Sequence, residues 1–208
     1  MAKLAKLLPL VRDAGAEDGN QAAVLDAALM AFLDFGIKRT SMTEVARRGG
    51  LSLATLYRRF AGKSELVQAV ALWQARRFVE QVDAVVQAQV DRDASAEDQI
   101  VELFIAFLAG LRRNRLLERL LNTEPEIVLP YLTTRGAPVI ELGRDYLAEF
   151  ITRLQSEGKL PQYDPLPVAE MVARTSLSLS LTPQTVIPID DDAAARQFAR
   201  RHVVPGFV

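Results

Sequence analysis

The stretch RTSMTEVARRGGLSLATLYRRF, residues 39–60, contains two short helical patterns on either side of a double glycine. Ser41 stands three residues before Glu44, the spacing of a capping box in which each side chain satisfies a free backbone N–H. Ser52, beyond the glycines, is a second strong N-cap. A tight turn favours a residue at positive φ, and we assign that position to Gly50 because a side chain would be strained there. The stretch therefore predicts a helix-turn-helix.

Positive charge is concentrated in the same region. Between Gly36 and Lys63 the chain has seven lysines and arginines and one acid, Glu44, which gives 7 − 1 = +6. The whole chain carries −1, so the remainder carries −1 − 6 = −7. Such a cluster repels itself, which favours a polyanionic partner and, with the motif, double-stranded DNA. Two alternatives stay open: a solvated basic face, and a helical protein-interaction module whose basic face binds an acidic protein.

The rest of the chain is helical by its apolar period. Apolar residues recur at three- and four-residue spacing, and glycine, proline and serine mark the ends of each run. Ser176–Leu181 alternates with period two, but an orphan strand is unstable, so we favour a helix there too. Outside the opening stretch, the predicted helices cover residues 24–35, 64–90, 95–111, 115–122, 125–132, 136–157, 165–181 and 190–202.

The expected fold is all-α, with three parts. Residues 1–20 are predicted to be a flexible basic arm, and residues 21–65 a three-helix, helix-turn-helix DNA-binding domain. A long helix, residues 64–90, then joins this domain to a larger helical domain formed by residues 66–208. Gly36 is expected to end the first helix of the DNA-binding domain.

Composition argues against an enzyme. The chain has no cysteine and a single histidine, His202, which excludes Cys–His chemistry and multi-histidine metal sites. Asp190–Asp192 are consecutive carboxylates that point in different directions, and helix capping explains them. No glycine-rich phosphate loop or nucleophile elbow is present. We therefore expect no catalytic residue, no metal and no cofactor. No run approaches the ~18 apolar residues of a membrane span, so we expect a cytoplasmic protein without a membrane partner.

Part of the chain resembles a known protein family. AALMAFLDFGIKRTSMTEVARRGGLSLATLYRRFAGKSELV, residues 27–67, is similar to the DNA-binding domain of tetracycline-repressor-type (TetR) transcription regulators. LTPQTVIPIDDDAAARQFARRHVVPGF, residues 181–207, resembles members of the same family less decisively. The resemblance implies a ligand-responsive homodimer that represses transcription from a palindromic operator, with residues 66–208 binding the effector and forming the dimer. A TetR-like activator is the alternative.

The resemblance also implies which residues meet DNA. Ser41 and Thr43 would contact the phosphate backbone, and Lys63 would anchor the long helix to a phosphate. Leu53, Ala54 and Thr55, in the helix after the double glycine, would face base edges. Tyr57 would reach a phosphate or a thymine methyl. Arginines at positions 58 and 59 depart from the family pattern and suggest extra backbone contacts or a guanine contact. The predicted DNA-binding residues are Ser41, Thr43, Ser52, Leu53, Ala54, Thr55, Tyr57, Arg58, Arg59 and Lys63.

For the larger domain the resemblance implies a small apolar effector and a dimer interface. The candidate effector-binding residues, each of which is also a plausible core residue, are Trp73, Phe104, Phe107, Tyr131, Tyr146, Phe150 and Met171. The helices near 136–157 and 165–181 are apolar around much of their circumference, which suits either a core or an interface. The candidate interface residues are Val139, Leu142, Gly143, Tyr146, Phe150, Val172, Thr175, Ser176 and Leu179.

Overall fold

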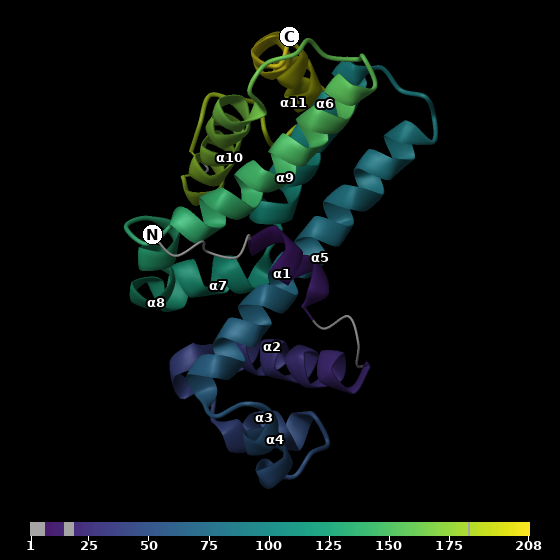
Figure 1. Cartoon of the computed structure of the whole chain (residues 1–208). Coiled ribbons are helices and arrows are strands. Elements are labelled where there is room, and N and C mark those ends of the chain that lie inside the picture. The colour runs from purple at the N-terminus through teal and green to yellow at the C-terminus, as the bar shows by residue number, and fades with distance from the viewer. Residues whose placement is uncertain (1–6, 15–18, 183) are drawn as a thin grey trace. The chain divides into compact units, whose positions relative to one another are not determined.

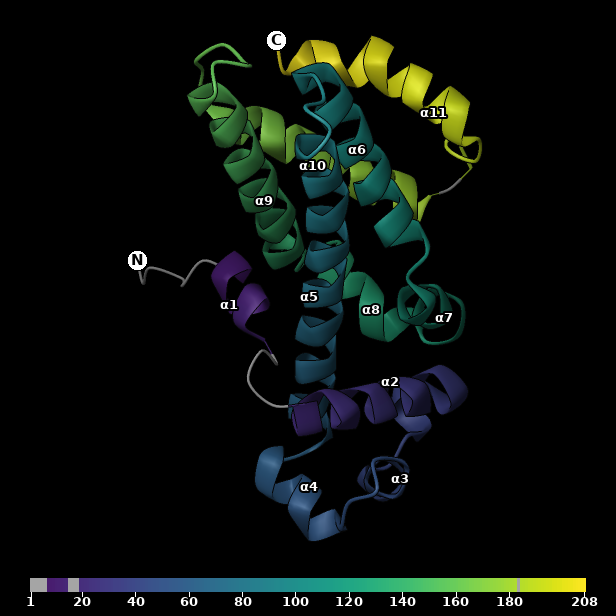
Figure 2. The same ribbon diagram turned by 90° about the vertical axis from the view of Figure 1, so that its right-hand side faces the viewer.

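The computed structural model describes residues 7–14, 19–182 and 184–208, and the regular elements in this part of the chain are all helical (Figures 1 and 2). The all-α prediction is confirmed. In chain order the helices are α1 (Leu7–Asp13), α2 (Gly19–Arg39), α3 (Met42–Arg48), α4 (Leu53–Arg59), α5 (Lys63–Val90), α6 (Ala96–Arg112), α7 (Arg115–Thr123), α8 (Pro125–Leu132), α9 (Ala137–Ser156), α10 (Pro165–Leu181) and α11 (Asp192–Phe198), followed by the short turns η1 (Ala199–Val203) and η2 (Val204–Gly206).

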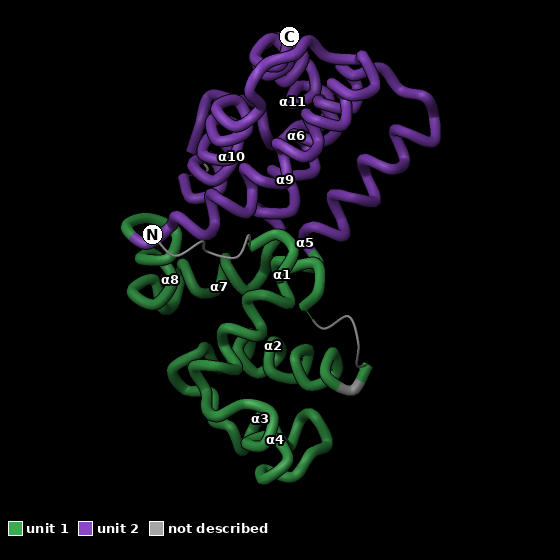
Figure 3. The backbone as a smooth tube through the Cα atoms, viewed as in Figure 1, with its two compact units in different colours: residues 1–77, 114–134 green, residues 78–113, 135–208 purple. Residues whose placement is uncertain are grey.

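Two compact units make up the chain (Figure 3). Unit 1 comprises residues 1–77 and 114–134, and unit 2 comprises residues 78–113 and 135–208. This division differs from the expected boundary near residue 65, because the chain returns to unit 1 as α7 and α8. The physical reason is burial: Leu120 of α7 belongs to the same apolar cluster as the side chains of α2.

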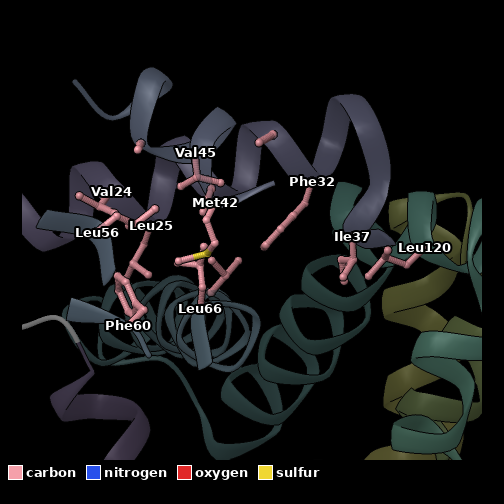
Figure 4. Packing of buried hydrophobic residues seen from close by; sticks show 14 residues of the cluster. Val24, Leu25, Phe32, Ile37, Met42, Val45, Leu56, Phe60, Leu66 and Leu120 are labelled. Atoms are coloured by element: carbon pink, nitrogen blue, oxygen red, sulfur yellow. The ribbon is translucent and has the colours of Figure 1, made fainter. Parts of the chain in front are cut away.

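The core of unit 1 is a buried cluster to which α2, α3, α4, α5 and α7 contribute (Figure 4). Phe32, Leu56 and Leu66 are fully buried in it. Burial of such a side chain contributes about 1.5–3 kcal/mol. Leu56 is the buried residue of α4, so this one leucine anchors the short helix to the core. The exposed side chains of α4 are Leu53, Ala54, Tyr57 and Arg58.

A short helix replaces part of the expected arm. Residues 7–13 form α1, in which Leu8 and Val11 are buried, and the Arg76 guanidinium donates a hydrogen bond to the Ala14 carbonyl at 2.8 Å. The arm's residues 1–6 and 15–18, with Lys3 and Lys6, lie outside the described residues. The difference arises because the apolar period of a seven-residue segment is too short to distinguish a docked helix from a loose arm.

Unit 2 is built around the packing of α6, α9 and α10, with α11 held to α6. Gly143 of α9 lies so close to α10 that an added Cβ would be 3.2 Å from the Ala173 Cβ. Arg196 of α11 makes a two-pronged ion pair with Glu102 of α6. Each helix of the described residues is too short or too polar to span a lipid bilayer.

Candidate nucleic-acid interface

The turn before α4 has the predicted backbone. Gly50 adopts φ +64°, whereas its neighbour Gly49 has φ −78°, a value open to any residue. The Leu51 N–H donates to the Ala46 carbonyl at 2.9 Å, which closes the turn after α3. The assignment of the special conformation to Gly50 is therefore confirmed, and this turn positions α4.

The outward face of α4 carries apolar side chains and a cationic one. Leu53 and Tyr57 are 39% and 49% exposed, and Ala54 and Arg58 are also exposed. Large apolar side chains on the surface of so short a helix contribute little to its own fold. Bases offer partners for them, because thymine methyls and base edges line the major groove. Arg59 differs from Arg58, since it is only partly exposed and takes part in an interaction within the chain.

Ser52 caps α4 as predicted. Its Oγ accepts a hydrogen bond from the Thr55 N–H at 3.1 Å and lies 2.8 Å from the Thr55 Oγ1. The two exposed hydroxyls thus share a hydrogen bond at the first turn of α4. A helix N-terminus with donors at this position favours an anion, such as a backbone phosphate.

Ser41 is the N-cap of α3, since its Oγ accepts from the Glu44 N–H at 3.1 Å. Glu44 itself bonds to Arg47 at 2.8 Å and Arg48 at 2.6 Å. These hydrogen bonds, that to Arg47 first, lower the pKa of Glu44 to about 2. Thr43 is exposed beside this cluster. The acid therefore stays ionised at neutral pH and orients cations of α3.

Lys63 begins α5 and uses part of its ammonium within the chain. Its Nζ donates to the Lys38 carbonyl at 2.8 Å and to the Thr40 carbonyl at 3.1 Å. An ammonium group has three N–H donors. Two are directed at the end of α2, and one remains for another acceptor. The predicted phosphate contact at Lys63 is compatible with this geometry only through the third donor.

In this small helical unit α4 is capped at its start, is anchored to the core by Leu56 and exposes its opposite face. These features define a class of protein, a helix-turn-helix protein that binds DNA. Comparison with known proteins adds the family. Profiles described as "Bacterial regulatory proteins, tetR family" and "Bacterial Tetracyclin repressor, C-terminal domain" match residues 24–70 and 96–201. The chain belongs to the TetR family of bacterial regulatory proteins, and it is a DNA-binding transcriptional regulator.

Curated relatives extend over most of the chain. The HTH-type transcriptional regulator AlkX of Mycobacterium tuberculosis is 29% identical over 196 residues, which covers 90% of each protein. An uncharacterized HTH-type transcriptional regulator of the same organism is 26% identical over 171 residues, covering 82% of this chain and 85% of the relative.

Among solved structures, the TetR family repressor AlkX from Dietzia sp., implicated in biodegradation of n-alkanes, has a TM-score of 0.63 at 22% identity and covers 89% of this chain and 98% of its own. FadR of Bacillus subtilis in complex with stearoyl-CoA has a TM-score of 0.53 at 14% identity, covering 90% of this chain and all of its own. Both share the fold.

The candidate effector-binding residues are divided between the units. Phe104, Phe107, Tyr146 and Phe150 are buried in unit 2. The Phe107 ring packs against the ring of Tyr146 at a centroid distance of 5.6 Å, and the Tyr146 hydroxyl donates to Asp83 at 2.7 Å. In the rest of the set, Trp73 belongs to unit 1 with its Nε1 donating to Asp26, Tyr131 of α8 is exposed, and Met171 of α10 is exposed.

The candidate interface residues divide by exposure. Thr175 is exposed on α10, whereas Val139, Leu142 and Gly143 of α9 are partly exposed. The close approach that we expected Gly143 to allow is made within the chain, to Ala173. The remaining residues are buried by the chain itself, and they are Tyr146, Phe150, Val172, Ser176 and Leu179.

Sequence reasoning missed the residues that hold the end of α2. Thr40 is buried and its hydroxyl donates to the Gly36 carbonyl at 2.7 Å. Glu124, between α7 and α8, accepts hydrogen bonds from backbone N–H groups 86 and 87 residues earlier. A glutamate before a proline carries no local signal for such a contact, so only the folded arrangement reveals it.

Proposed function

We propose that the chain is a ligand-responsive homodimeric repressor that binds a palindromic operator, with one α4 in each half-site. The observation that supports the DNA-reading part most strongly is the exposure of Leu53, Tyr57 and Arg58 on one capped helix. In this proposal α4 reads base edges and phosphates in the major groove, and the exposed hydroxyls of Ser41 and Thr43 bind the backbone. These phosphate contacts position the protein, whereas the base contacts select the sequence.

The dimer follows from the amount of sequence that one helix can read. A single recognition helix covers only a few base pairs, so a unique genomic site requires two copies about one helical turn apart. We place the contact at the outward face of α10, where Met171 is 56% exposed and Thr175 lies one turn further on. Arg144, Glu170 and Arg174 line a hollow with Met171. A two-fold axis through such a face would pair unlike charges across it.

For the effector we propose a small apolar molecule. Two proteins of the same fold are a repressor implicated in biodegradation of n-alkanes and a regulator in complex with stearoyl-CoA. We carry over only the chemical class of a long apolar chain. The aromatic residues in the interior of unit 2 suit such a ligand, because they provide apolar surface without a charge to desolvate. We propose that the ligand acts on DNA binding through α5, which contributes residues to both units.

Selection of bound sequences from a pool of random duplexes tests the DNA-reading proposal. We expect a palindromic consensus with half-sites about one helical turn apart. Affinity for the selected duplex should fall by orders of magnitude between roughly 50 and 200 mM salt, and a scrambled duplex should bind far more weakly. Equal affinity for selected and scrambled duplexes would favour the alternative, a basic surface that binds an acidic protein.

The effector proposal needs its own titration. A long-chain n-alkane, a long-chain fatty acid and stearoyl-CoA are added separately to the complex with the selected duplex. Release of DNA by one of them, at a concentration that leaves the helical circular dichroism unchanged, supports the proposal; constant affinity for DNA with all three contradicts it. Transcription from a promoter carrying the selected duplex then distinguishes a repressor from an activator.

A further inference from the structure

The end of α2 is held by a buried carboxylate from a distant part of unit 1. Glu124 is only 7% exposed, and its two carboxylate oxygens accept from the Ile37 N–H at 2.7 Å and the Lys38 N–H at 3.1 Å. Hydrogen bonds from backbone N–H groups to an ionised acceptor are among the stronger ones. A buried charge requires such partners, since without them it would destabilise the fold.

The backbone at this point is shaped to receive the carboxylate. Gly36 has φ +79° and ψ 166°, a conformation open essentially to glycine alone. A Cβ at Gly36 would lie 2.8 Å from the Glu124 Oε1, which is too close for a real atom pair. The break at Gly36 interrupts the helical hydrogen-bond pattern, so the following N–H groups need other partners. Glu124 supplies them.

α7 binds the other side of the same break. The Arg119 guanidinium donates to the Phe32 carbonyl at 3.2 Å and to the Asp34 carbonyl at 3.0 Å. Leu120, next in sequence, is buried in the core of unit 1. One short segment therefore supplies a cation for carbonyls before the break, an anion for N–H groups after it, and an apolar anchor between them. We call Arg119, Leu120 and Glu124 the clamp, because together they hold the end of α2 on both sides of the break.

Lys38 connects Glu124 of the clamp to Lys63, the residue proposed to contact a DNA phosphate. Its backbone N–H donates to Glu124, and its backbone carbonyl accepts from the Lys63 ammonium at 2.8 Å. The Thr40 carbonyl is the second acceptor for the same ammonium. The position of Lys63 thus depends on backbone groups that Glu124 helps to fix.

We propose that Glu124 is a positioning residue for DNA binding, which holds the Lys38 backbone so that the Lys63 ammonium is oriented toward a DNA phosphate. Two N–H groups of Lys63 are fixed on carbonyls and the third donates to the phosphate. This inference rests on the proposed phosphate contact of Lys63. Without the carboxylate, the Lys38 backbone is free to move and the third donor loses its direction.

The positioning role of Glu124 and its charge predict opposite changes in DNA affinity when the carboxylate is removed. Removing an acid from the DNA-binding unit reduces repulsion of phosphates, so charge alone predicts tighter binding. Glu126 is a matched control, because it forms an exposed ion pair with the side chain of the same Lys38 whose backbone Glu124 holds. We expect Glu126→Gln to strengthen DNA binding slightly and Glu124→Gln to weaken it, although both variants lose one negative charge.

The experiment measures DNA affinity of the full chain as a function of salt concentration. Two probes are used: a fluorescent duplex of about 30 base pairs with random sequence, and the duplex recovered by selection. The variants are Lys63→Gln, Glu124→Gln, Glu126→Gln and the double variant of Lys63 and Glu124. Log affinity falls as log salt rises, and each lost phosphate contact lowers the magnitude of this slope by about 0.9. A purely structural role for Glu124 would change the melting temperature without changing this slope.

We expect Lys63→Gln and Glu124→Gln each to weaken binding about tenfold and to lower the magnitude of the slope by about 1.8, about 0.9 for each protomer of the dimer, with no further reduction in the double variant. An unchanged slope in Lys63→Gln overturns the phosphate contact and with it this inference. A normal slope in Glu124→Gln, while Lys63→Gln shows the reduction, overturns the positioning role alone.

A second variant covers the case in which Glu124→Gln does not fold. Glu124→Asp keeps the charge but is one methylene shorter, so it loses reach without changing the electrostatic attraction to DNA. We expect it to lower the salt slope as Lys63→Gln does. Binding of both probes by Glu124→Asp with the slope and affinity of the unaltered chain overturns the proposal.

Discussion

The Oγ of Ser52 lies 3.1 Å from the Thr55 backbone nitrogen and 2.8 Å from the Thr55 Oγ1, so the cap of α4 and a proposed base-facing residue form one hydrogen-bonded pair. Ser52 therefore has two roles that substitutions can separate. Ser52→Ala removes the cap and should lower the free energy of unfolding by about 1 kcal/mol. Ser52→Asp restores a capping oxygen but places a negative charge where a phosphate is proposed to bind.

We predict that Ser52→Asp unfolds at the same urea concentration as the unaltered chain yet binds the selected duplex at least about tenfold more weakly, because a carboxylate repels phosphate. Urea unfolding followed by circular dichroism and DNA titration of the same preparations check this. Undiminished DNA binding by the folded aspartate variant would remove Ser52 from the interface.

The two adjacent glycines should respond differently to alanine. Gly50 has φ +64°, where an L-residue costs roughly 1–2 kcal/mol, whereas Gly49 has φ −78°. Gly50→Ala should lower the free energy of unfolding by that amount. Gly49→Ala should cost less than Gly50→Ala, since the backbone there suits any residue and the added Cβ would lie 3.3 Å from the Val45 carbonyl oxygen, 3.7 Å from the Ala27 Cβ and 3.9 Å from the Ala46 carbonyl oxygen. Equal destabilisation by both, measured by urea unfolding, would contradict the turn assignment.

The pKa of Glu44 predicts a dependence of stability on pH. Hydrogen bonds from Arg47 and Arg48 lower this pKa from 4.5 to about 2. A group whose pKa is lowered by folding stabilises the fold above its unfolded pKa, and the stabilisation is lost as pH falls through the folded value. The stability difference between the unaltered chain and Glu44→Gln should therefore diminish between pH 4.5 and about 2. Thermal melts across this range measure it.

Salt provides the control for this measurement. The ion pairs lie near the surface, where the side chains of Arg47 and Glu44 are 70% and 22% exposed. Added salt should screen them and reduce the difference at neutral pH. A stability difference between the two proteins that stays constant from neutral pH to pH 2 would show that the carboxylate does not act through its charge.

The proposed dimer face predicts a substitution that separates association from folding. Thr175 is exposed on α10 in the single chain, so Thr175→Glu should leave the free energy of unfolding of the monomer nearly unchanged. In a two-fold interface the substitution introduces two like charges that lie close together, and we expect the dimer to dissociate. Sedimentation velocity measures the oligomeric state. A dimer that persists in Thr175→Glu would place the interface on another face.

Local structure in this chain was predictable from sequence because its signals are local. Ser41, Gly50 and Ser52 act on backbone groups within four residues, and the sequence shows both partners together. The helix through Ser176–Leu181 also follows from a local argument, because an unpaired strand has no hydrogen-bond partners. The all-α fold and the DNA-binding class depend on signals of this kind.

Contacts between distant residues were not predictable. Glu124 and Lys38 are 86 positions apart, and nothing in either neighbourhood specifies the other. Their contact decides that α7 and α8 belong with the DNA-binding unit. It also bears on Lys63, whose assignment to a phosphate overlooked two carbonyls that occupy part of its ammonium. The exposure of individual side chains was not predictable either, since the sequence could not distinguish buried Phe150 from exposed Met171.

The central claim, that α4 reads the base sequence, is tested most directly by replacing Tyr57 with alanine. Met30 of α2 is the matched control, because it is 50% exposed in the same unit while Tyr57 is 49% exposed. The measurement is a titration of the selected and scrambled duplexes with the unaltered chain, Tyr57→Ala and Met30→Ala. We predict that Tyr57→Ala folds normally and loses its preference for the selected duplex, whereas Met30→Ala retains it. An unchanged preference in Tyr57→Ala would contradict the assignment of α4 as the recognition helix.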